Sequence, residues 1–355
     1  MPHPSFDLHQ PDAVNCLTQL LENGQIVALP TDTVPGLAIA ADAPNAAATL
    51  SALKGYDTPR PFSLHFSSIE QLAKWAPSLP PGLASWLMEH LPQGVTAVMP
   101  AKWLAIPQSW QWQWPLVGLR LPQDPGFQAV AAQLQAPLLM TSINAAGTDP
   151  LFGHALLDWL AEKDIPAAAG LGDFAPSSPS AVIEFNPLPQ LRRGTLPVDQ
   201  MQPGLRILVL CSGNICRSPV GEVMLRAEIA SAWGVKESDL AALGWHFASA
   251  GTFAMPGGPA SEHSIAVAAD VGLDLRSHLS ANMEDLLDLG WDLILGMGLN
   301  HLAPLPEESA KDLYDPIGRP VPDPFGGPLE AYQQMRDHMQ TATADRVQMW
   351  SQWPF

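Results

Sequence analysis

The feature that most constrains this chain is a short apolar segment, residues 206–210 (RILVL), which runs directly into a polar loop at residues 211–219. The residues that follow, 218–232, have the apolar spacing of a helix. A loop between a buried strand and a helix can point its backbone N–H groups inward, and the helix N-terminus adds positive potential. The segment therefore predicts an anion site on a strand–loop–helix unit of an α/β sheet.

The loop reads Cys-Ser-Gly-Asn-Ile-Cys-Arg-Ser-Pro. Arg217 offers a two-pronged donor for phosphate oxygens, and the positive field favours the thiolate of Cys211, an in-line nucleophile toward a phosphoryl group. Gly213 permits close backbone approach. We expect Asn214 to hold the loop by side-chain hydrogen bonds and Ser218 to donate to the sulfur as it leaves a phosphocysteine. The alternative is a structural cysteine at a strand end, which this combination of strand, spacing and helix disfavours.

Length and composition indicate that this strand–loop–helix unit belongs to a chain of two domains. The chain has 355 residues, of which 47% are hydrophobic and 15% are charged, so it is long and apolar enough for two cores. Residues 197–204 hold two prolines and a glycine and read as a linker. We therefore predict one domain over residues 1–196 and a second over residues 205–355.

Charge and cysteine content narrow the class of protein. The net charge of −18 disfavours non-specific binding to nucleic acid or to anionic membranes. No apolar stretch reaches 18 residues and the first residues do not read as a signal peptide. Three cysteines without a Cys/His cluster suit a reducing compartment and no structural zinc. We expect a cytoplasmic protein that has no membrane or direct nucleic-acid partner.

Strands and helices alternate in both parts, which indicates an α/β fold class. In the first part we expect helices at residues 12–23, 45–53 and within 68–91, and strands at 25–29, 62–66, 95–99, 116–121, 137–141 and 181–185. In the second we expect strands at 206–210, 244–249 and 292–296, and helices at 218–232, 262–271, 281–288 and 328–347.

Three motifs of the second part resemble those of the low-molecular-weight protein tyrosine phosphatases: residues 211–219, Ser249-Ala-Gly251 and Asp323-Pro-Phe-Gly-Gly327. The resemblance covers about residues 205–350 and implies a doubly wound, four-stranded parallel sheet and no cofactor. It makes Asp323 the general acid, although an Asp before proline is also a common turn residue. It places the other loop residues around the phosphate: Ser212, Gly213, Asn214, Ile215, Cys216 and Ser218.

The same resemblance bears on regulation and substrate. In that family a second loop cysteine, here Cys216, can trap the nucleophile as a reversible disulfide, although free cysteines also simply pack. No cysteine follows Cys216, which disfavours the related arsenate reductases. Ile215 is typical of the tyrosine-phosphatase branch, whereas residues 249–254 and 323–327 resemble the arginine-phosphatase branch. We expect a phosphorylated protein as substrate, with phosphotyrosine favoured over phosphoarginine.

Candidate ligand-binding residues of the first part are more scattered. Residues 31–33 (Thr-Asp-Thr) follow an expected strand, Lys54 and Arg60 flank a loop, and residues 142–147 follow another strand. Residues 31–33 are also explained as a capping or turn cluster, and Lys54 and Arg60 as a solvated surface. Tryptophans alternate at 110, 112 and 114, where packing of a loop or edge strand is favoured over stacking on adenine.

Taken in order, these segments resemble the YrdC/TsaC family of threonylcarbamoyl-AMP synthases over about residues 10–196. The matching positions are Pro-Thr-Asp-Thr at 30–33, Lys54-Gly, Arg60-Pro61, His65, residues 117–122, Ser142-x-Asn144 with Gly147, Ser180 and Arg193-Gly194. The resemblance implies a YrdC-like fold with a twisted mixed α/β sheet. It also implies an enzyme that combines L-threonine, bicarbonate and ATP, with Mg²⁺, into a product used for modification of tRNA adenosine 37. No metal site made only of protein ligands is implied.

Carried over position by position, the resemblance assigns two groups of residues. The threonine pocket comprises Thr33, His65, Arg120 and Ser142. The ATP site comprises Lys54, Arg60, Asn144, Ser180 and Arg193, and cations there suit the charge that builds on departing pyrophosphate.

This chain departs from the family pattern at Pro35, where a tyrosine is usual, at Tyr56, where an arginine is usual, and at residues 92–96. Three hypotheses therefore stand. The chain is a bifunctional enzyme, or a phosphatase whose first domain only binds nucleotide, threonine or a partner, or a scaffold without activity, which intact Cys211, Arg217 and Asp323 disfavour.

Overall fold

The computed structural model describes residues 5–58, 61–107, 114–145, 148–174, 177–197 and 199–352. Arg60, Gly147, Trp110 and Trp112 lie outside the described residues. The chain divides into two compact units, Met1–Ser78 with Trp86–Met201, and Leu79–Ser85 with Gln202–Phe355. Among the described residues, no helix has the length and apolar character needed to cross a membrane.

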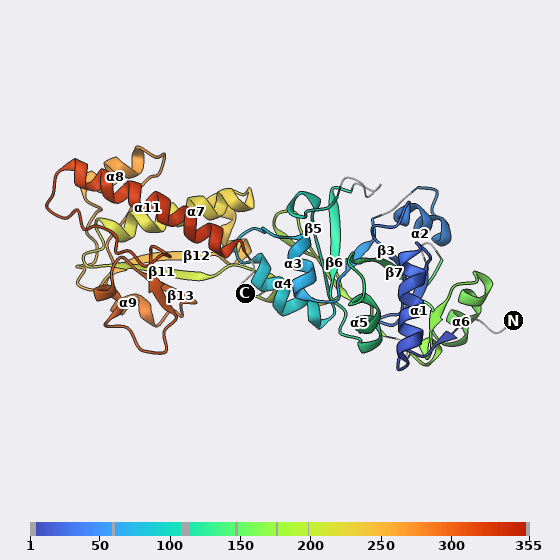
Figure 1. Cartoon of the computed structure of the whole chain (residues 1–355). Helices are drawn as coiled ribbons and strands as arrows, with labels where there is room; N and C mark the ends of the chain where they lie inside the picture. Colours follow the sequence, from blue (N-terminus) through green and yellow to red (C-terminus); the bar gives the residue numbers. More distant parts are fainter. Residues whose placement is uncertain are drawn as a thin grey trace. The chain divides into compact units, whose positions relative to one another are not determined.

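The first unit is built on a mixed sheet of ten strands in the order β1-β8-β2-β3-β7-β4-β6-β5-β9-β10 (Figure 1). The sheet contains parallel pairs such as β4–β6 and β5–β9 and antiparallel pairs such as β3–β7 and β5–β6. The strands are β1 Ser5–Phe6, β2 Val27–Leu29, β3 Gly36–Ala40, β4 Ser63–His65, β5 Val95–Pro100, β6 Leu116–Arg120, β7 Leu138–Ser142, β8 Ala167–Ala168, β9 Ala181–Phe185 and β10 Pro189–Arg193. The prediction of a mixed α/β sheet is confirmed.

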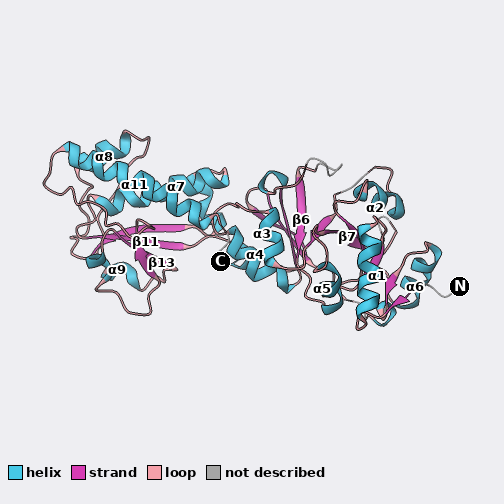
Figure 2. Ribbon diagram, viewed as in Figure 1, coloured by secondary structure: helices cyan, strands magenta, loops and turns pink. Residues whose placement is uncertain are grey.

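Helices and short 3₁₀ turns connect these strands (Figure 2). The α-helices are α1 Pro11–Glu22, α2 Ala46–Lys54, α3 Ile69–Trp75, α4 Leu83–His90, α5 Pro125–Ala131 and α6 Gly153–Glu162. The 3₁₀ helices are η1 Leu91–Gln93, η2 Ala101–Trp103, η3 Leu171–Asp173 and η4 Asp199–Met201.

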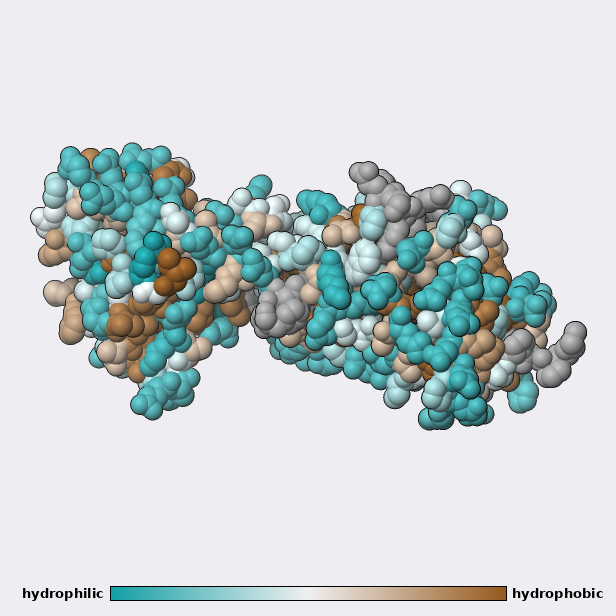
Figure 3. Space-filling view, viewed as in Figure 1, coloured by the Kyte–Doolittle hydropathy of each residue, from teal (hydrophilic) through white to brown (hydrophobic). Residues whose placement is uncertain are grey.

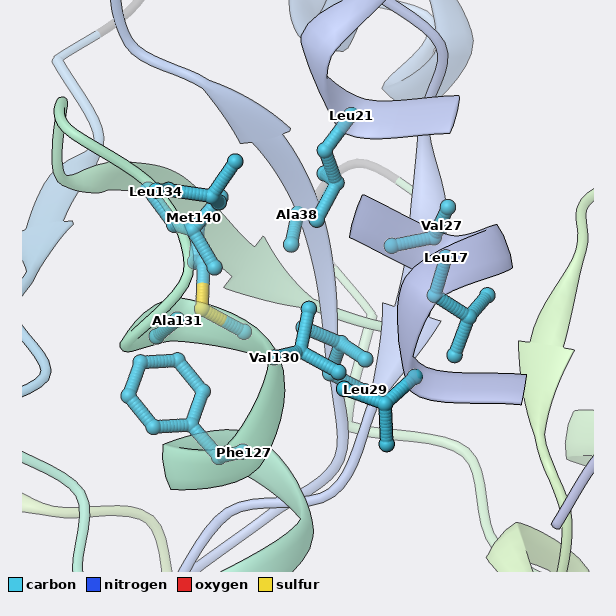
Figure 4. Packing of buried hydrophobic residues seen from close by; sticks show 12 residues of the cluster. Leu17, Leu21, Val27, Leu29, Ala38, Phe127, Val130, Ala131, Leu134 and Met140 are labelled. Carbon is cyan, nitrogen blue, oxygen red and sulfur yellow. The ribbon is translucent and has the colours of Figure 1, made fainter. Parts of the chain in front are cut away.

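The core of the first unit lies where α1 and α5 cover β2, β3 and β7 (Figure 4). Leu17 and Leu21 are one helical turn apart on α1, so both reach the sheet, and both are fully buried. Phe127 of α5 and Met140 of β7 fill the space between helix and sheet. This packing holds the strands whose ends carry the candidate threonine and ATP residues.

The second unit contains a four-stranded sheet in the order β12-β11-β13-β14, in which every pair is parallel. Its strands are β11 Arg206–Cys211, β12 His246–Gly251, β13 Leu293–Gly296 and β14 Lys311–Leu313. Its helices are α7 Arg217–Trp233, α8 Glu262–Ala269, α9 Glu284–Leu287, α10 Leu299–Leu302 and α11 Leu329–Trp350, with η5 Glu237–Leu243. The predicted four-stranded parallel sheet is confirmed.

Helices cover both faces of this sheet. Helices α7, α8 and α11 pack together on one face, while α9 lies on the other (Figure 1). Leu208, Leu210 and Ile294 form the core beneath the α9 face and are at most 4% exposed. Because both faces are buried, β11 reads as a continuous apolar run.

Several elements differ from the expectation from sequence. Strand β3, which begins shortly after residues 31–33, was not expected, and neither were β1, β8, β10, β14, α5, α6 and α10. The helix expected at residues 281–288 is only α9, Glu284–Leu287. Ala281 lies outside the helix, and its N–H donates to Asn214 Oδ1 while its carbonyl accepts from the Gly251 N–H. A tertiary contact therefore overrides local helix propensity there.

Candidate active sites

In the second unit, β11 ends at Cys211 and α7 begins at Arg217, so the polar loop lies between the strand end and the helix N-terminus. The Cys211 thiol is buried, 3.1 Å from Ser218 Oγ. The backbone N–H of Asn214 donates to Cys211 Sγ at 3.2 Å. Asn214 has φ 52°, a left-handed conformation that Asn tolerates better than most residues, and this turns its N–H toward the sulfur.

Asn214 also joins the loop to its surroundings. Its Nδ2 donates to Ser218 Oγ at 2.8 Å, and its Oδ1 accepts from the Ala281 backbone at 2.8 Å. Its carbonyl lies 2.8 Å from His278 Nε2. A Cβ added at Gly251 would lie 2.5 Å from the Ser212 carbonyl oxygen and 2.9 Å from Asn214 N. The loop is therefore held by side-chain bonds on one side and by close backbone packing on the other.

The backbone N–H groups of Gly213, Ile215 and Cys216 make no hydrogen bond to any part of the protein that the structure describes. They border the cavity above Cys211, at the N-terminal end of α7. Free N–H groups at the positive end of a helix dipole form a site for a small anion such as phosphate.

The candidate general acid lies in the same cavity. Arg217 Nη2 is 2.5 Å from Asp323 Oδ2, and the Arg217 side chain is 8% exposed while that of Asp323 is 50% exposed. This cavity has a volume of about 220 Å³. A second, larger cavity of about 570 Å³ lies in the first unit. The lining of the smaller cavity comprises Cys211, Ser212, Gly213, Ile215, Cys216, Arg217, Phe253, Asp323 and Phe325.

Two lining residues, Phe253 and Phe325, were not among the predicted site residues. They are 85% and 73% exposed, unusual for phenylalanine, and they flank the opening of the cavity. Their place in the sequence could have predicted them, because each lies in a family motif, Ser-Ala-Gly-Thr-Phe or Asp-Pro-Phe.

Cys216 is buried in this loop. Its Sγ lies 3.4 Å from the Tyr332 hydroxyl and 3.6 Å from Ser261 Oγ. Burial and the contact with Cys216 raise the pKa of Tyr332, so the phenol remains protonated at neutral pH. A reversible disulfide between Cys216 and Cys211 stays a prediction.

In the first unit, strand and loop ends surround the larger cavity. Seven of the predicted residues line it: Lys54, His65, Arg120, Ser142, Asn144, Ser180 and Arg193. Thr33 is not part of the lining, but its Oγ1 accepts from Arg120 Nη1 at 2.7 Å. Arg60, the remaining predicted residue, lies outside the described part of the chain.

Arg120 is buried at the end of β6. Its Nη2 forms an ion pair with Asp32 Oδ1 at 2.6 Å, whereas its Nε is buried without a partner among the described groups. The neighbouring His65 is buried, and burial together with the Arg120 charge lowers the pKa of His65 to about 3. His65 is therefore neutral at physiological pH, and Arg120 supplies the positive charge at this end of the cavity.

Two further cations face the cavity without a carboxylate partner in the described structure. Lys54 Nζ donates to the Ser142 carbonyl at 2.8 Å and also to Asn144 Oδ1. Burial lowers the pKa of Lys54 to about 8. Arg193 Nε donates to the Ser180 carbonyl at 3.1 Å. A cavity lined by unpaired cations is suited to an anionic ligand.

The two departures from the family pattern are also located. Pro35 is buried next to the lining residue Val34, and Tyr56 lines the cavity itself. A tyrosine at position 56 supplies a phenol where a guanidinium would bring a positive charge.

In the comparison with known proteins, each of the two units matches a different family. A model of the Sua5/YciO/YrdC family, described as telomere recombination, matches residues 19–194. A model of the low molecular weight phosphotyrosine protein phosphatases matches residues 206–349.

Three curated relatives illustrate the similarity. Low molecular weight protein-tyrosine-phosphatase Etp of Escherichia coli K12 is 30% identical over 148 residues, which cover 39% of this chain and 90% of that protein. A protein-arginine-phosphatase of Bacillus subtilis is 29% identical over 143 residues, covering 38% and 89%. Human threonylcarbamoyl-AMP synthase is 31% identical over 134 residues, covering 38% of this chain and 47% of that protein.

For the second unit, the sequence motifs, the parallel sheet and the length of the relatives that is covered all indicate one family. For the first unit, the mixed sheet and the family model indicate a YrdC-type domain. The chain thus joins a YrdC-type domain to a phosphatase domain, through which it belongs to the low molecular weight phosphotyrosine protein phosphatase family.

Proposed function

We propose that the second unit hydrolyses phosphorylated protein through a phosphocysteine intermediate. The observation that carries this proposal is one cavity of about 220 Å³ that holds the Cys211 thiol, Arg217 and Asp323. Free backbone N–H groups of the loop add to the charge of Arg217 in binding a phosphate dianion.

In the first step, Cys211 Sγ attacks phosphorus and the bond to the leaving oxygen breaks, while Asp323 gives that oxygen its proton. In the second step, Asp323 takes a proton from water, the water oxygen attacks phosphorus, and the S–P bond breaks to release phosphate. Ser218 lies 3.1 Å from the sulfur and stabilises the thiolate as it leaves.

The substrate proposed for this cavity is phosphotyrosine. The apolar side chains of Ile215, Phe253 and Phe325 line it, and they suit a neutral aromatic ring better than the polar guanidine group of phosphoarginine. The ratio of kcat/KM for matched phosphotyrosine and phosphoarginine peptides measures this preference. The variant Ile215→Thr is expected to lower that ratio, and a wild-type ratio below one would reverse the assignment.

The nucleophile is tested with Cys211→Ser. Turnover of an aryl phosphate should fall by at least about a thousandfold, the scale for removal of a catalytic nucleophile. The hydroxyl is not activated as a thiolate is, although phosphate binding should persist. Near-wild-type turnover in this variant would assign the nucleophile to another group.

We propose that the first unit forms L-threonylcarbamoyl-AMP and pyrophosphate from L-threonine, bicarbonate and MgATP. This proposal is supported by Arg120, whose buried Nε lacks a partner among the described groups and suits a carboxylate, and by Lys54 and Arg193, which suit phosphates. Mg²⁺ is proposed to enter with the triphosphate. The product would feed tRNA modification, in a cytoplasmic setting, without contact between this step and the tRNA.

Pyrophosphate release is the test, measured on the full chain in the Cys211→Ser background. Release that requires both L-threonine and bicarbonate is expected. Omission of either substrate provides the control, and Lys54→Ala should remove the signal because the variant lacks one phosphate-binding cation.

Pro35 and Tyr56 favour a second candidate, a first unit that binds ATP without turnover. ATP binding with no pyrophosphate release, under conditions that support a known synthase, would establish it. In that case Tyr56→Arg, which restores a phosphate-binding cation, is the variant in which to look for recovered release.

A further inference from the structure

An imidazole lies beneath the phosphate cavity of the second unit without any role in the mechanism above. His301 lies in the short helix α10, directly after β13, and is 1% exposed. Its Nε2 lies 3.0 Å from the Oγ of Ser212, the second residue of the loop and part of the cavity lining. A nearly fully buried histidine therefore contacts the hydroxyl of a residue that lines the phosphate site.

His301 is neutral under ordinary conditions. Burial and the nearby Arg217 charge lower its pKa to about 4, and Asp323 only partly opposes this shift. A neutral imidazole carries one N–H, so the contact with Ser212 has two possible senses. Either Nε2–H donates to Ser212 Oγ, or Nε2 accepts the hydroxyl hydrogen.

The two senses present different groups to the cavity. When Nε2–H donates, the hydroxyl hydrogen of Ser212 is free to point at a phosphate oxygen. When Nε2 accepts, Ser212 presents only lone pairs, which repel a phosphate dianion. A bound dianion therefore selects the first arrangement, because each hydrogen bond polarises the next in a chain that ends on the anion.

We propose that His301 and Ser212 form a hydrogen-bond relay that adds a side-chain donor to the phosphate site, with His301 acting as a positioning residue through Ser212. The relay rests on the proposed phosphatase function and deepens it. It extends phosphate recognition beyond the backbone N–H groups and Arg217.

The test is the inhibition constant of inorganic phosphate against aryl-phosphate hydrolysis by the full chain. This constant reports only on the phosphatase cavity, so phosphate bound by the first unit does not enter it. Ser212→Ala should weaken phosphate by about tenfold or more, the range for a hydrogen bond to a charged group. Ser212→Thr, which keeps the hydroxyl, should retain most of the affinity.

His301 is tested through its coupling to Ser212. His301→Leu should weaken phosphate to the same extent as Ser212→Ala, and the double variant should lose no more than either single variant. His301→Gln, whose amide N–H₂ can still donate to Ser212, should recover part of the loss. Ser231→Ala, an exposed position at the end of α7, serves as the control and should match wild type.

The outcomes separate the relay from the phosphatase proposal. A wild-type chain without aryl-phosphate turnover would overturn both. Normal turnover with an unchanged inhibition constant in Ser212→Ala would overturn the relay alone. Losses that multiply in the double variant, with no recovery in His301→Gln, would show that His301 acts only on the fold.

Discussion

The charge on Asp323 affects both its ion pair with Arg217 and its proposed role as an acid. Its carboxylate pairs with the Arg217 guanidinium at 2.5 Å. An incoming phosphate dianion competes for the same guanidinium and repels a charged carboxylate beside it. In the proposed mechanism, Asp323 instead gives a proton to the leaving oxygen.

Asp323→Ala should therefore slow hydrolysis in a way that depends on the leaving group. Aryl phosphates with poor leaving groups should lose about 10²- to 10⁴-fold in kcat, the range for general acid catalysis, and those with good leaving groups should lose much less. The measurement is a plot of log kcat against leaving-group pKa. Parallel plots for wild type and variant would remove Asp323 from the acid role.

Lys54 predicts a pH dependence in the first unit. Burial lowers the pKa of Lys54 to about 8, so its ammonium is charged below that pH and neutral above it. At pH 9 only about a tenth of the free protein carries the charge, and ATP affinity should be about tenfold weaker than at pH 7. Calorimetric titration of ATP into Cys211→Ser protein across this range provides the measurement.

The matched control for this prediction is Lys54→Arg. A guanidinium does not titrate in this range, so the variant should show little change in ATP affinity between pH 7 and pH 9. The same decline in wild type and in Lys54→Arg would mean that another group causes it.

At the scale of elements, the end of β12 determines the shape of the phosphate loop. Gly251 pairs with Cys211 in register, and its N–H and carbonyl are both bonded to the segment at residues 281–283. Two backbone atoms of the loop occupy the space that a side chain at 251 would need. The loop can therefore adopt this shape because the last residue of the neighbouring strand β12 is a glycine.

Gly251→Ala should weaken phosphate inhibition by about tenfold or more, because the loop must move away and its N–H groups no longer converge. The comparison variant is Gly258→Ala, where the nearest atom to an added Cβ is Ser280 Oγ at 3.3 Å. Gly258→Ala should bind phosphate nearly as wild type. Equal behaviour of the two variants would contradict the steric argument.

At the scale of the whole molecule, the described lining of each candidate site comes from one unit. The lining of the larger cavity comes from residues 31–193, and that of the smaller one from residues 211–325. Each unit has its own sheet and its own buried core. The described linings of the two sites thus share no residue.

The two activities should therefore be separable by single substitutions. Cys211→Ser should remove aryl-phosphate turnover and leave pyrophosphate release within about twofold, and Lys54→Ala should do the reverse, because sites that share no residue act additively. Both activities are measured on both variants. A change in phosphatase kcat in Lys54→Ala would instead reveal coupling between the sites.

Much of the candidate phosphatase site could be predicted because its residues are close in sequence. Cys211, Asn214, Arg217 and Ser218 lie within eight consecutive residues, so strand, loop and helix alone bring them together. His301 was not predictable, because a histidine after a short strand resembles any core histidine. Its contact with Ser212 depends on how α10 packs beneath the loop.

The first unit shows the same division. Spacing predicted strands at residues 116–121 and 137–141, close to β6 and β7. It did not predict β3, where Gly36–Ala40 pairs with β7, or β10, which carries Arg193. Short strands of small or charged residues lack a clear alternation, and their pairing is decided by distant partners.

By itself the sequence predicted the α/β fold class and a polar loop between a strand and a helix at residues 211–219, because apolar periodicity and a short contiguous motif act locally. Only the tertiary structure decided which distant groups meet that loop. Asp323, Phe253 and His301 reach it from three separate segments, and Asp32 reaches Arg120 across 88 positions. The physical reason is that such contacts depend on strand order and on backbone packing, which no local pattern encodes.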